Sequence, residues 1–517
     1  MVDPESPEQE VRAAGQGGLA VLFAKGYFIA IGLVQQALLP LVIGIAGYGA
    51  LSRVLAVSNI FNNVVVASSI QGVSREVASS GVEGDARFRS ALRVHGTLAI
   101  TLAILFAGLA PFVAAFEHAS EMLAPLLVMA IVLGVYGFYA PLVGYLNGRR
   151  SFVKQASLDV LAATLRTAGL LVAGAIFLRV GKTGALGATV GAAGAACTIL
   201  VVALWWTRRS ASSPVNAPAG FSTSVYLRGL LPVILAQLFT NALMQADILL
   251  LGRFLSIGAT STGASNASAN EWVGVYRACQ LFSFLPYQLL FSITSVLFPM
   301  LAKTKAERGD EAVRDLVSKG TRLGLLVCGL LLSAVVFLPE SLIRFAFGPA
   351  IAMRGASTLR VLAIGQGTFA LIGLATTVLV SLGKEMVALG VTISTLLLIC
   401  GACFVGLPSA EFGAPMLERA ALLTTGALTC GLLIAWRSVV HVVGAFVPLR
   451  SFARVAAGIA LIAVAGRALP SLGRIATIGA SFAALALYVL WLLLSREIGS
   501  ADVAWFKALA TRRKASG

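Results

Sequence analysis

The sequence predicts an all-α polytopic membrane protein with about fourteen transmembrane helices. Of its 517 residues, 58% are hydrophobic and 12% are charged, and the mean hydropathy is +0.90. Soluble proteins carry about 25% charged residues, so this composition excludes an ordinary soluble fold. Apolar runs of about 20 residues recur along the whole chain, and each is long enough to cross a bilayer as a helix.

The apolar runs set the approximate limits of the predicted helices. In chain order these limits are 17–44, 48–78, 90–116, 121–146, 152–178, 183–207, 225–255, 271–301, 311–338, 355–382, 385–407, 415–440, 451–469 and 474–495. The start, MVDPESPEQE, is acidic and has no basic n-region, so no cleavable signal peptide is expected.

The predicted helices form two lobes and an additional pair of C-terminal helices. The expected organisation is a cytoplasmic N-terminal tail at 1–16, a first lobe at 17–207, a cytoplasmic linker at 208–224, a second lobe at 225–440, two additional helices at 451–495 and a basic cytoplasmic tail at 496–517.

Lysine and arginine gather in every other loop between the predicted helices. The basic segments include GRRSFVK at 148–154, KTKAERGDEAVRDLVSK at 303–319 and the tail TRRK at 511–514. The alternate loops GIAGYG, EHASE and GATSTGASNASAN contain neither residue. Because cytoplasmic loops carry the excess of these residues, both termini are predicted to be cytoplasmic. The exceptions to this distribution are Arg179, Lys182, Arg344, Arg354, Arg467 and Arg474.

The formal net charge of +17 fits this cytoplasmic bias, and it also fits an anionic substrate or an anionic lipid. No nucleic-acid partner is expected for a chain this apolar. All six cysteines lie within apolar runs, and the CxxC of Cys400 and Cys403 has no second pair to complete a metal site. Without a Walker loop or an HExxH motif, neither ATP hydrolysis nor a metal cofactor is expected.

Two halves of the sequence resemble each other. GALSRVLAVSNIF aligns with VGVYRACQLFSFL, which places Arg53 over Arg277. Two further matches follow at slowly growing offsets: Pro111 with Pro339, and Gly148 with Gly383. Each half then holds about six helices, and an even number keeps the halves parallel, with a substrate expected at their interface. The helices 451–469 and 474–495 fall outside the repeat.

The second predicted helix carries a polar arc inside the apolar chain. On a helical wheel its polar residues fall within about 140°. They are Ser52, Ser58, Asn59, Asn62, Asn63 and Ser69. Unpaired amides in hydrocarbon cost several kcal/mol, so this arc is not expected to face lipid. It predicts either hydrogen bonds between helices or the wall of a water-filled cavity, and its width favours the cavity.

Two other helices repeat this theme. Lys25 and Gln36 share one face of the first predicted helix, and Gln237, Asn241 and Gln245 follow an i, i+4 rhythm in the seventh. Together with the eighth helix, these helices are predicted to surround one central space.

Ionisable residues inside the membrane are candidates for function. Arg166 is the strongest candidate, because it lies on the order of 20 Å from either end of its helix. Asp159 lies seven residues earlier on the same face, so a structural Asp159–Arg166 pair is the alternative. Arg53 and Arg277 lie near outer helix ends, where contact with lipid phosphates is the alternative. Asp247 is expected either to pair with Arg253 or to titrate.

Basic residues match or outnumber acidic residues at depth. The predicted cationic cavity comprises Lys25, Arg53, Arg166 and Arg277, and the acids are Asp159 and Asp247. Such a cavity favours a phosphate, a pyrophosphate or an acidic sugar, since arginine forms bidentate contacts with phosphate oxygens. A site for cationic drugs would have the opposite charge.

The chain resembles the multidrug/oligosaccharidyl-lipid/polysaccharide exporter superfamily. The resemblance is carried by SRVLAVSNIFNNVVVASSIQGVSR, by LNGRR echoed as LGK, and by VYRACQLFSFLPYQLLFSITSVLFPML. Over about residues 17–495 it is most similar to bacterial polysaccharide flippases of the O-antigen type. Related lipid II flippases place basic residues in helices 1, 2 and 8, and Lys25, Arg53 and Arg277 fall in comparable places, with lysine instead of arginine in helix 1.

The resemblance implies a V-shaped fold of two six-helix lobes plus two C-terminal helices in the bacterial inner membrane. The implied function is movement of an undecaprenyl-pyrophosphate-linked oligosaccharide from the cytoplasmic to the periplasmic leaflet by alternating access, for synthesis of O-antigen or exopolysaccharide. The implied partners are this substrate and membrane lipids, together with a polysaccharide polymerase and glycosyltransferases. Coupling to a proton or sodium gradient through Asp159 or Asp247 is the expected energy source.

Three alternatives remain open. A cation-coupled multidrug antiporter and a lipid II flippase belong to the same superfamily. A membrane polymerase or ligase acting on the same lipid carriers belongs to another class, but such an enzyme needs a substantial periplasmic loop. No predicted loop is long enough to fold as a domain, so an enzyme is not expected.

Overall fold

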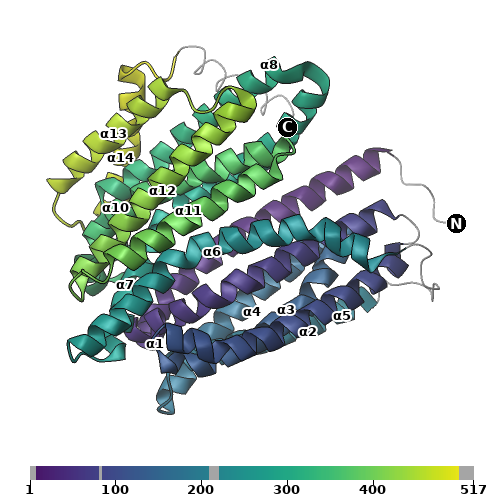
Figure 1. Cartoon of the computed structure of the whole chain (residues 1–517), viewed down its shortest axis with the longest axis horizontal. Helices are drawn as coiled ribbons and strands as arrows, with labels where there is room; N and C mark the ends of the chain where they lie inside the picture. Colours follow the sequence, from purple (N-terminus) through teal and green to yellow (C-terminus); the bar gives the residue numbers. More distant parts are fainter. Residues whose placement is uncertain (1–6, 81–83, 209–220, 500–517) are drawn as a thin grey trace. The chain divides into compact units, whose positions relative to one another are not determined.

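The computed structural model describes residues 7–80, 84–208 and 221–499, and every regular element in these ranges is helical (Figure 1). The elements are α1 (Pro7–Ser79), α2 (Gly84–Phe116), the short 3₁₀ helix η2 (Ser120–Met122), α3 (Leu123–Gly148), α4 (Phe152–Arg179), α5 (Gly184–Arg208), α6 (Thr223–Ser261), α7 (Asn266–Ser283), α8 (Leu285–Phe337), α9 (Pro339–Phe347), α10 (Pro349–Ser381), α11 (Glu385–Gly406), α12 (Ala414–Val443), α13 (Leu449–Arg467) and α14 (Arg474–Leu494).

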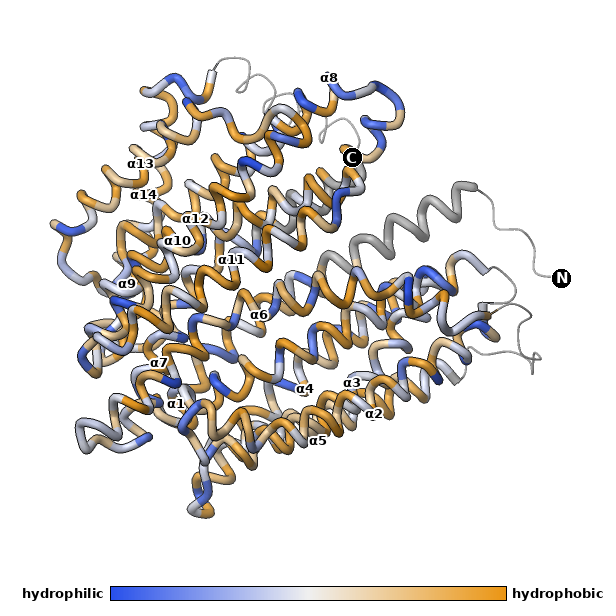
Figure 2. The backbone as a smooth tube through the Cα atoms, viewed as in Figure 1, coloured by the Kyte–Doolittle hydropathy of each residue, from blue (hydrophilic) through white to orange (hydrophobic). Residues whose placement is uncertain are grey.

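Twelve helices in the described ranges are long and apolar enough to cross a membrane. Figure 2 shows these helices as mainly hydrophobic, with hydrophilic residues gathered at places such as the turn of α8. The prediction of an all-α polytopic membrane protein is therefore confirmed. Fewer spans are found than the fourteen predicted, because α1 contains the first two predicted helices and the eighth is divided between α7 and α8.

The helix α1 is a hairpin of two crossings joined at Gly44. This residue has a φ of 74°, which a residue without a Cβ adopts at little cost, and it interrupts the helical backbone. The Tyr48 hydroxyl donates to Gln36 Oε1 at 2.8 Å, although twelve residues of continuous helix would separate them by about 18 Å. The predicted loop between these helices is therefore reduced to a single residue.

The second half of the chain has a break that the apolar pattern did not reveal. The predicted helix 271–301 is interrupted at Phe284, just before Pro286, which has no amide hydrogen to continue a helix. Residues 339–354, which lie between two predicted helices, contain α9, which begins at Pro339 and ends at Phe347 and is followed by Gly348 with a φ of 85°. The predicted helix 355–382 begins earlier, at Pro349.

The described chain forms two compact units, residues 1–277 with 411–413, and residues 278–410 with 414–517. The boundary between these compact units falls after Arg277, whereas the sequence predicts a boundary between the lobes in the linker 208–224. That the two predicted lobes move as separate bodies therefore stays a prediction. The segments 1–6, 209–220 and 500–517, which hold most of the predicted tails and linker, lie outside the described residues. Residues 7–16 of the predicted N-terminal tail belong to α1.

Each unit has its own helix packing. In the first unit, α1 packs against α2, α3, α4, α5 and α6, and its buried valines and leucines form apolar clusters with apolar residues of α2, α3, α4 and α5. In the second unit, α10 is the central helix and packs against α8, α9, α11 and α12, while α13 and α14 pack on α8. The candidate site residues, Arg277 included, lie in the first unit.

Candidate functional site

The first crossing of α1 lies along α4, and polar side chains connect the two helices within the apolar span. The Tyr27 hydroxyl and Thr164 Oγ1 are 2.8 Å apart, and Thr167 Oγ1 donates to Gln35 Oε1 at 3.1 Å. Because polar groups in hydrocarbon need partners, these pairs fix α1 and α4 against each other. They provide the frame for the charged residues between them.

Arg166 is the most deeply placed of these charges. It is half-buried, its guanidinium carbon lies 5.1 Å from the centroid of the Phe28 ring, and its Nε atom is buried without a hydrogen-bond partner. Among the described residues it has no carboxylate partner. The alternative of an Asp159–Arg166 pair is therefore wrong in this structure, in which the two backbone positions lie about 10 Å apart along the helix axis.

Asp159 instead faces Lys25. Asp159 is half-buried, Lys25 is exposed on α1, and the two are close enough for the charge of Lys25 to act on the carboxyl group. Tyr136 and Tyr139 of α3 lie within electrostatic reach of Arg166 and Asp159, respectively. We call Lys25, Asp159 and Arg166 the α1–α4 charged cluster. These residues are two of the four predicted cations and one of the two predicted acids, and they lie on two helices that pack against each other.

The polar arc on the second crossing of α1 is partly used for contact with α6. Asn63 Nδ2 donates to Asn241 Oδ1 at 2.7 Å, and Asn241 Nδ2 donates in turn to Gln237 O at 2.8 Å and to Gln237 Oε1 at 3.3 Å. Three predicted cavity residues therefore lie in one chain of hydrogen bonds. In the conformation described, this part of the arc serves helix–helix contact, which was the alternative interpretation.

Other members of the arc remain unsatisfied or bond to their own helix. Asn59 and Asn62 are half-buried, and Asn62 Oδ1 and Gln245 Oε1 are buried without hydrogen-bond partners. Ser52 and Ser58 donate to the carbonyls of Tyr48 and Val54 one turn earlier, so they are internally satisfied. The amide oxygens of Asn62 and Gln245 are therefore buried acceptors that lack a partner in this conformation.

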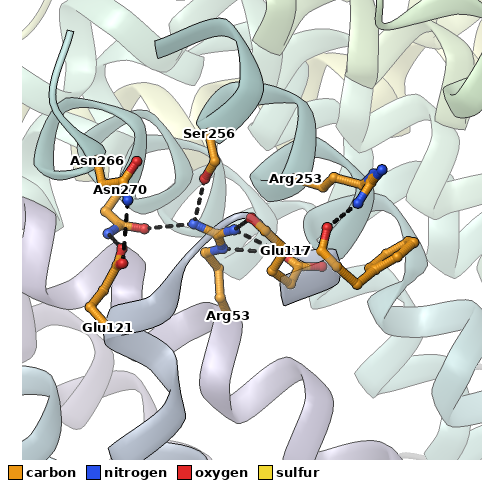
Figure 3. Close-up of polar contacts among 8 residues, drawn as sticks. Arg53, Glu117, Glu121, Arg253, Ser256, Asn266 and Asn270 are labelled. Carbon is orange, nitrogen blue, oxygen red and sulfur yellow. Dashed lines mark hydrogen bonds and ion pairs between the residues drawn. The ribbon is translucent and has the colours of Figure 1, made fainter. Parts of the chain in front are cut away.

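Arg53 lies in a separate buried network, shown in Figure 3. Its side chain is fully buried and contacts three segments of the first unit. Its Nη2 donates to Glu117 Oε2 at 2.9 Å and to Glu117 O at 2.6 Å, and its Nη1 donates to Ser256 Oγ at 3.0 Å and Asn270 Oδ1 at 3.1 Å. Contact of Arg53 with lipid phosphates, the alternative interpretation, is wrong here because no part of the guanidinium is exposed.

The network continues to neighbouring residues. Asn270 Nδ2 donates to Glu121 Oε1 at 3.0 Å, and Asn266 Nδ2 donates to Glu121 Oε2 at 3.4 Å. Burial raises the pKa of Glu117, and the charge and hydrogen bonds of Arg53 oppose this rise. The Arg53 network, defined as Arg53, Glu117, Glu121, Ser256, Asn266 and Asn270, thus joins α1, the α2–η2 turn, α6 and α7.

Asp247 and Arg253 of α6 do not form the pair that the sequence offered as one alternative. Asp247 is buried and accepts a hydrogen bond from the Tyr276 hydroxyl at 2.9 Å. Arg253 instead donates to the carbonyl of Phe116 and lies 4.2 Å from the centroid of the Phe116 ring. Arg277, the fourth predicted cation, is half-buried on α7. A substrate-binding role for Arg53 and Arg277 stays a prediction.

Sequence reasoning missed a buried histidine. His95 of α2 lies 2.9 Å through Nδ1 from Ser69 Oγ of α1 and 2.9 Å through Nε2 from the Tyr226 hydroxyl of α6. The sequence contains only three histidines, and the position of this one inside an apolar run could have indicated a buried, hydrogen-bonded side chain. Glu117 was missed because it lies in a loop that was noted only for its lack of basic residues.

Comparison with known protein families gives one match over more than half of the chain. The profile of the family described as "Polysaccharide biosynthesis protein" matches residues 14–305. A search of curated proteins gives no match.

Several solved structures share the fold. A lipid II flippase, MurJ, in an inward closed conformation has a TM-score of 0.70 and 14% identity, covering 93% of this chain and 99% of that chain. A multidrug-resistance MATE transporter in an inward-facing conformation has a TM-score of 0.62 and 16% identity, covering 80% and 94%. A transporter of the same superfamily from Pyrococcus furiosus, described as having a binding pocket of reversed polarity, has a TM-score of 0.54 and 17% identity, covering 81% and 95%.

Proposed function

Because the chain belongs to the polysaccharide biosynthesis protein family, we propose that it is a flippase for a lipid-linked oligosaccharide. The substrate is an undecaprenyl-pyrophosphate-linked sugar repeat unit, which moves from the cytoplasmic to the periplasmic leaflet of the bacterial inner membrane by alternating access. Family membership supports the role in polysaccharide synthesis, and the shared fold with MurJ and MATE transporters supports a transporter rather than an enzyme.

The observation that carries the proposal is Arg166 in the α1–α4 charged cluster. A guanidinium in mid-membrane is costly unless an anion compensates it, and Arg166 has only the Phe28 ring and a buried, unpaired Nε. A pyrophosphate supplies several oxygens that accept bidentate hydrogen bonds from arginine. Lys25, on the first crossing of α1, adds a second positive charge that attracts the same pyrophosphate. Two positive charges would repel a cationic drug.

The remaining polar residues fit the sugars. Asn59, Asn62 and Gln245 offer amide groups to hydroxyls, and the acceptors of Asn62 and Gln245 are unpaired in the ligand-free protein. The polyprenyl tail stays in lipid, because apolar chains gain nothing from entering a wet cavity. The substrate therefore divides into a polar part held by protein and an apolar part held by the membrane.

Alternating access requires a closure that opens after the substrate has been bound. The Arg53 network supplies such a closure between α1 and the α6–α7 segment, at the end that the loop charges assign to the periplasm. Opening there breaks the bonds of Arg53 to Ser256 and Asn270, while the Arg53–Glu117 pair stays within the first helices of the chain. Proton or sodium coupling is assigned to Asp159 in preference to Asp247, because Tyr276 already engages Asp247.

The test is transport of a fluorescent undecaprenyl-pyrophosphate oligosaccharide in proteoliposomes. The variants Arg166→Ala and Arg166→Lys are compared with Arg179→Ala, which removes an exposed arginine from the end of the same helix. We expect Arg166→Ala to lose at least about tenfold in initial rate, Arg166→Lys to retain an intermediate rate, and Arg179→Ala to match wild type.

Two results would count against the proposal. Wild-type proteoliposomes that move no sugar lipid but export organic cations would support the multidrug antiporter. An Arg166→Ala variant that folds and transports at the wild-type rate would remove the cationic cluster from the mechanism. Asp159→Asn tests the coupling separately, and an unchanged rate with an unchanged ion dependence would exclude Asp159 as the coupling residue.

A further inference from the structure

Four of the six basic residues that depart from the predicted loop charge distribution lie in the second unit. They are Arg344, Arg354, Arg467 and Arg474. Arg344 is on α9, Arg354 is near the start of α10, Arg467 ends α13 and Arg474 begins α14. Because α9 packs against α10 and α14, these positions gather at one end of the unit. The flippase cycle proposed above uses none of them.

Positive charge is concentrated at this end, where several arginines lie near one another. Arg360 on α10 donates to the Val336 carbonyl at 3.3 Å, and Arg467 is close enough to repel it. Arg344 has one carboxylate partner, Glu340, at 2.6 Å, and its Nε is buried without a hydrogen-bond partner. Arg474 is exposed and forms no hydrogen bond or ion pair with the described residues. An anion bound among these groups would relieve their repulsion.

A cavity of about 230 Å³ lies among these helices. Its lining includes Arg344 and Arg474, with Phe345, Gly348, Gly473 and Thr477 between them. The volume is sufficient for a phosphate group. Two guanidinium groups on one small cavity match the preference of arginine for phosphate oxygens.

The cavity also receives the N-termini of two long helices. Gly348 precedes α10 and Gly473 precedes α14, and neither N-terminus has a side-chain cap. Glycine has no side-chain oxygen, so the first amide hydrogens of α14 are left for water or a ligand, whereas α10 begins at Pro349 and its first available amide is that of the next residue. These amides and the helix dipoles add to the attraction that the two arginines exert on an anion.

An apolar stripe leads away from the cavity along α14. Ile475, Ile478 and Phe482 follow an i, i+3, i+7 spacing and are 88%, 50% and 67% exposed. Phe345, at the cavity itself, is 45% exposed. A free phosphate has no use for such a stripe, whereas a lipid acyl chain packs along it.

We propose that this cavity binds the phosphate of an anionic phospholipid, with an acyl chain along Ile475, Ile478 and Phe482. The assignment concerns a bound membrane lipid and not the transported substrate. On the predicted topology, the cavity faces the periplasmic leaflet. Retention of a lipid at the α9–α14 contact is therefore a second binding function of the protein, located in the unit that does not hold the candidate transport site.

The test is native mass spectrometry of the purified full-length protein with added phosphatidylglycerol, phosphatidylcholine or inorganic phosphate. The double variant Arg344→Gln/Arg474→Gln is compared with Arg179→Gln/Lys182→Gln, which removes the other two exceptional charges from the first unit. We expect the cavity variant to lose about tenfold or more in phosphatidylglycerol affinity, while the control matches wild type. Wild type is expected to bind phosphatidylcholine more weakly.

Three outcomes would overturn the proposal: equal phosphatidylglycerol binding by wild type and the cavity variant, an equal loss in the control, or displacement of the lipid by an equal concentration of inorganic phosphate. If the double variant does not fold, Arg474→Gln replaces it. Arg474 has no hydrogen bond or ion pair with the described residues, so its substitution leaves the packing intact. The same direction of loss is expected.

Discussion

At the scale of single residues, Arg53 shows how a charge is accommodated in an apolar unit. Each of its guanidinium nitrogens has a partner, and Glu117 supplies both a carboxylate and a main-chain carbonyl. A buried ion pair of this kind is not a large source of stability by itself, because both ions lose their hydration. Its importance appears when one partner is removed and the other is left buried.

We expect Arg53→Ala to destabilise the protein by about 3–5 kcal/mol, because Glu117 would remain as an uncompensated buried charge. Glu117→Gln keeps an acceptor for the guanidinium and is expected to cost less. Ser52→Ala, which removes a buried hydroxyl from the adjacent position, is the control. Thermal unfolding in detergent should rank the losses in that order, and equal losses for Arg53→Ala and Ser52→Ala would contradict this account.

The sequence placed Arg53 correctly in a helix but could not identify its partner. Glu117 lies 64 residues away, in a turn whose meeting with α1 depends on the packing of several helices. The same holds for Asp159. Its spacing from Arg166 suggested a pair, whereas its position relative to α1 made Lys25 the nearer charge. Local periodicity determines the face of a helix, but the choice of partner across helices is a tertiary property.

At the scale of helices, close packing in the first unit depends on glycine. A Cβ on Gly49 of α1 would lie 1.7 Å from the carbonyl oxygen of Asn270, and a Cβ on Gly274 of α7 would lie 2.7 Å from the carbonyl oxygen of Ile45. The two backbones therefore approach each other directly, as small residues permit in membrane proteins. This crossing brings Asn270 within reach of Arg53.

We expect Gly49→Ala to destabilise the protein by about 1–3 kcal/mol, because the added methyl group would push α1 and α7 apart. Gly26→Ala is the matched control in the same helix. A Cβ there meets nothing within 4 Å, so alanine should be neutral or stabilising by up to about 1 kcal/mol. A lower unfolding temperature for Gly49→Ala and an equal or higher one for Gly26→Ala, each relative to wild type, would support the close contact of α1 with α7. A decrease of the same size in both variants would contradict it.

A second anchor joins α13 and α14 to α8 in the second unit. Glu497 accepts from Arg322 Nε at 2.8 Å, from Arg454 Nη1 at 3.0 Å and from Ser451 Oγ at 2.5 Å. Burial alone would raise the pKa of this carboxyl, but the three hydrogen bonds outweigh burial and hold the pKa below its ordinary value of 4.5. The charged form of Glu497 is therefore the one that anchors the helices.

Because the pKa is lowered on folding, the anchor contributes stability above pH 4.5 and loses it as the pH falls through the folded pKa. Hydrogen exchange of α13 and α14 should become faster in wild type as the pH is lowered through this range, after correction for the intrinsic rate. Glu497→Gln should show fast exchange at neutral pH already and no such transition. Glu307→Gln, at an exposed ion pair on α8, should behave like wild type.

The helical elements themselves were largely predictable, and the exceptions have local causes. Apolar runs of sufficient length located each of the twelve candidate spans in the described ranges, because the bilayer imposes that length. They did not reveal the break before Pro286, since a proline inside an apolar run leaves the hydropathy almost unchanged. They also missed α9, whose amphipathic nine residues are too short to register as a span.

At the scale of the whole molecule, the alternation of basic loops predicts an orientation that can be tested directly. Ala267 lies in the first turn of α7, within the segment 258–270, which is free of lysine and arginine, and Ala306 lies beside the basic turn of α8; both are exposed. In intact cells, a membrane-impermeant thiol reagent should label Ala267→Cys and leave Ala306→Cys unlabelled until the membrane is permeabilised.

Labelling must be compared with the parent protein, because Cys197 and Cys430 are also exposed in the structure. The reverse pattern would invert the topology, and with it the side from which the proposed flippase takes its substrate. Labelling of both positions in intact cells would place them on the same side of the membrane. It would therefore exclude the single crossing that α7 and the first part of α8 are expected to make between them.

The hairpin at Gly44 has a consequence for how the protein is made. With a single residue joining the first two crossings, no hydrophilic segment has to be carried through the bilayer when they insert. The pair can enter the membrane as one folded element, already joined by the Tyr48–Gln36 hydrogen bond. The earliest step of biogenesis would then create the surface onto which α4 later docks, so the order of synthesis along the chain matches the order in which the transport site is assembled.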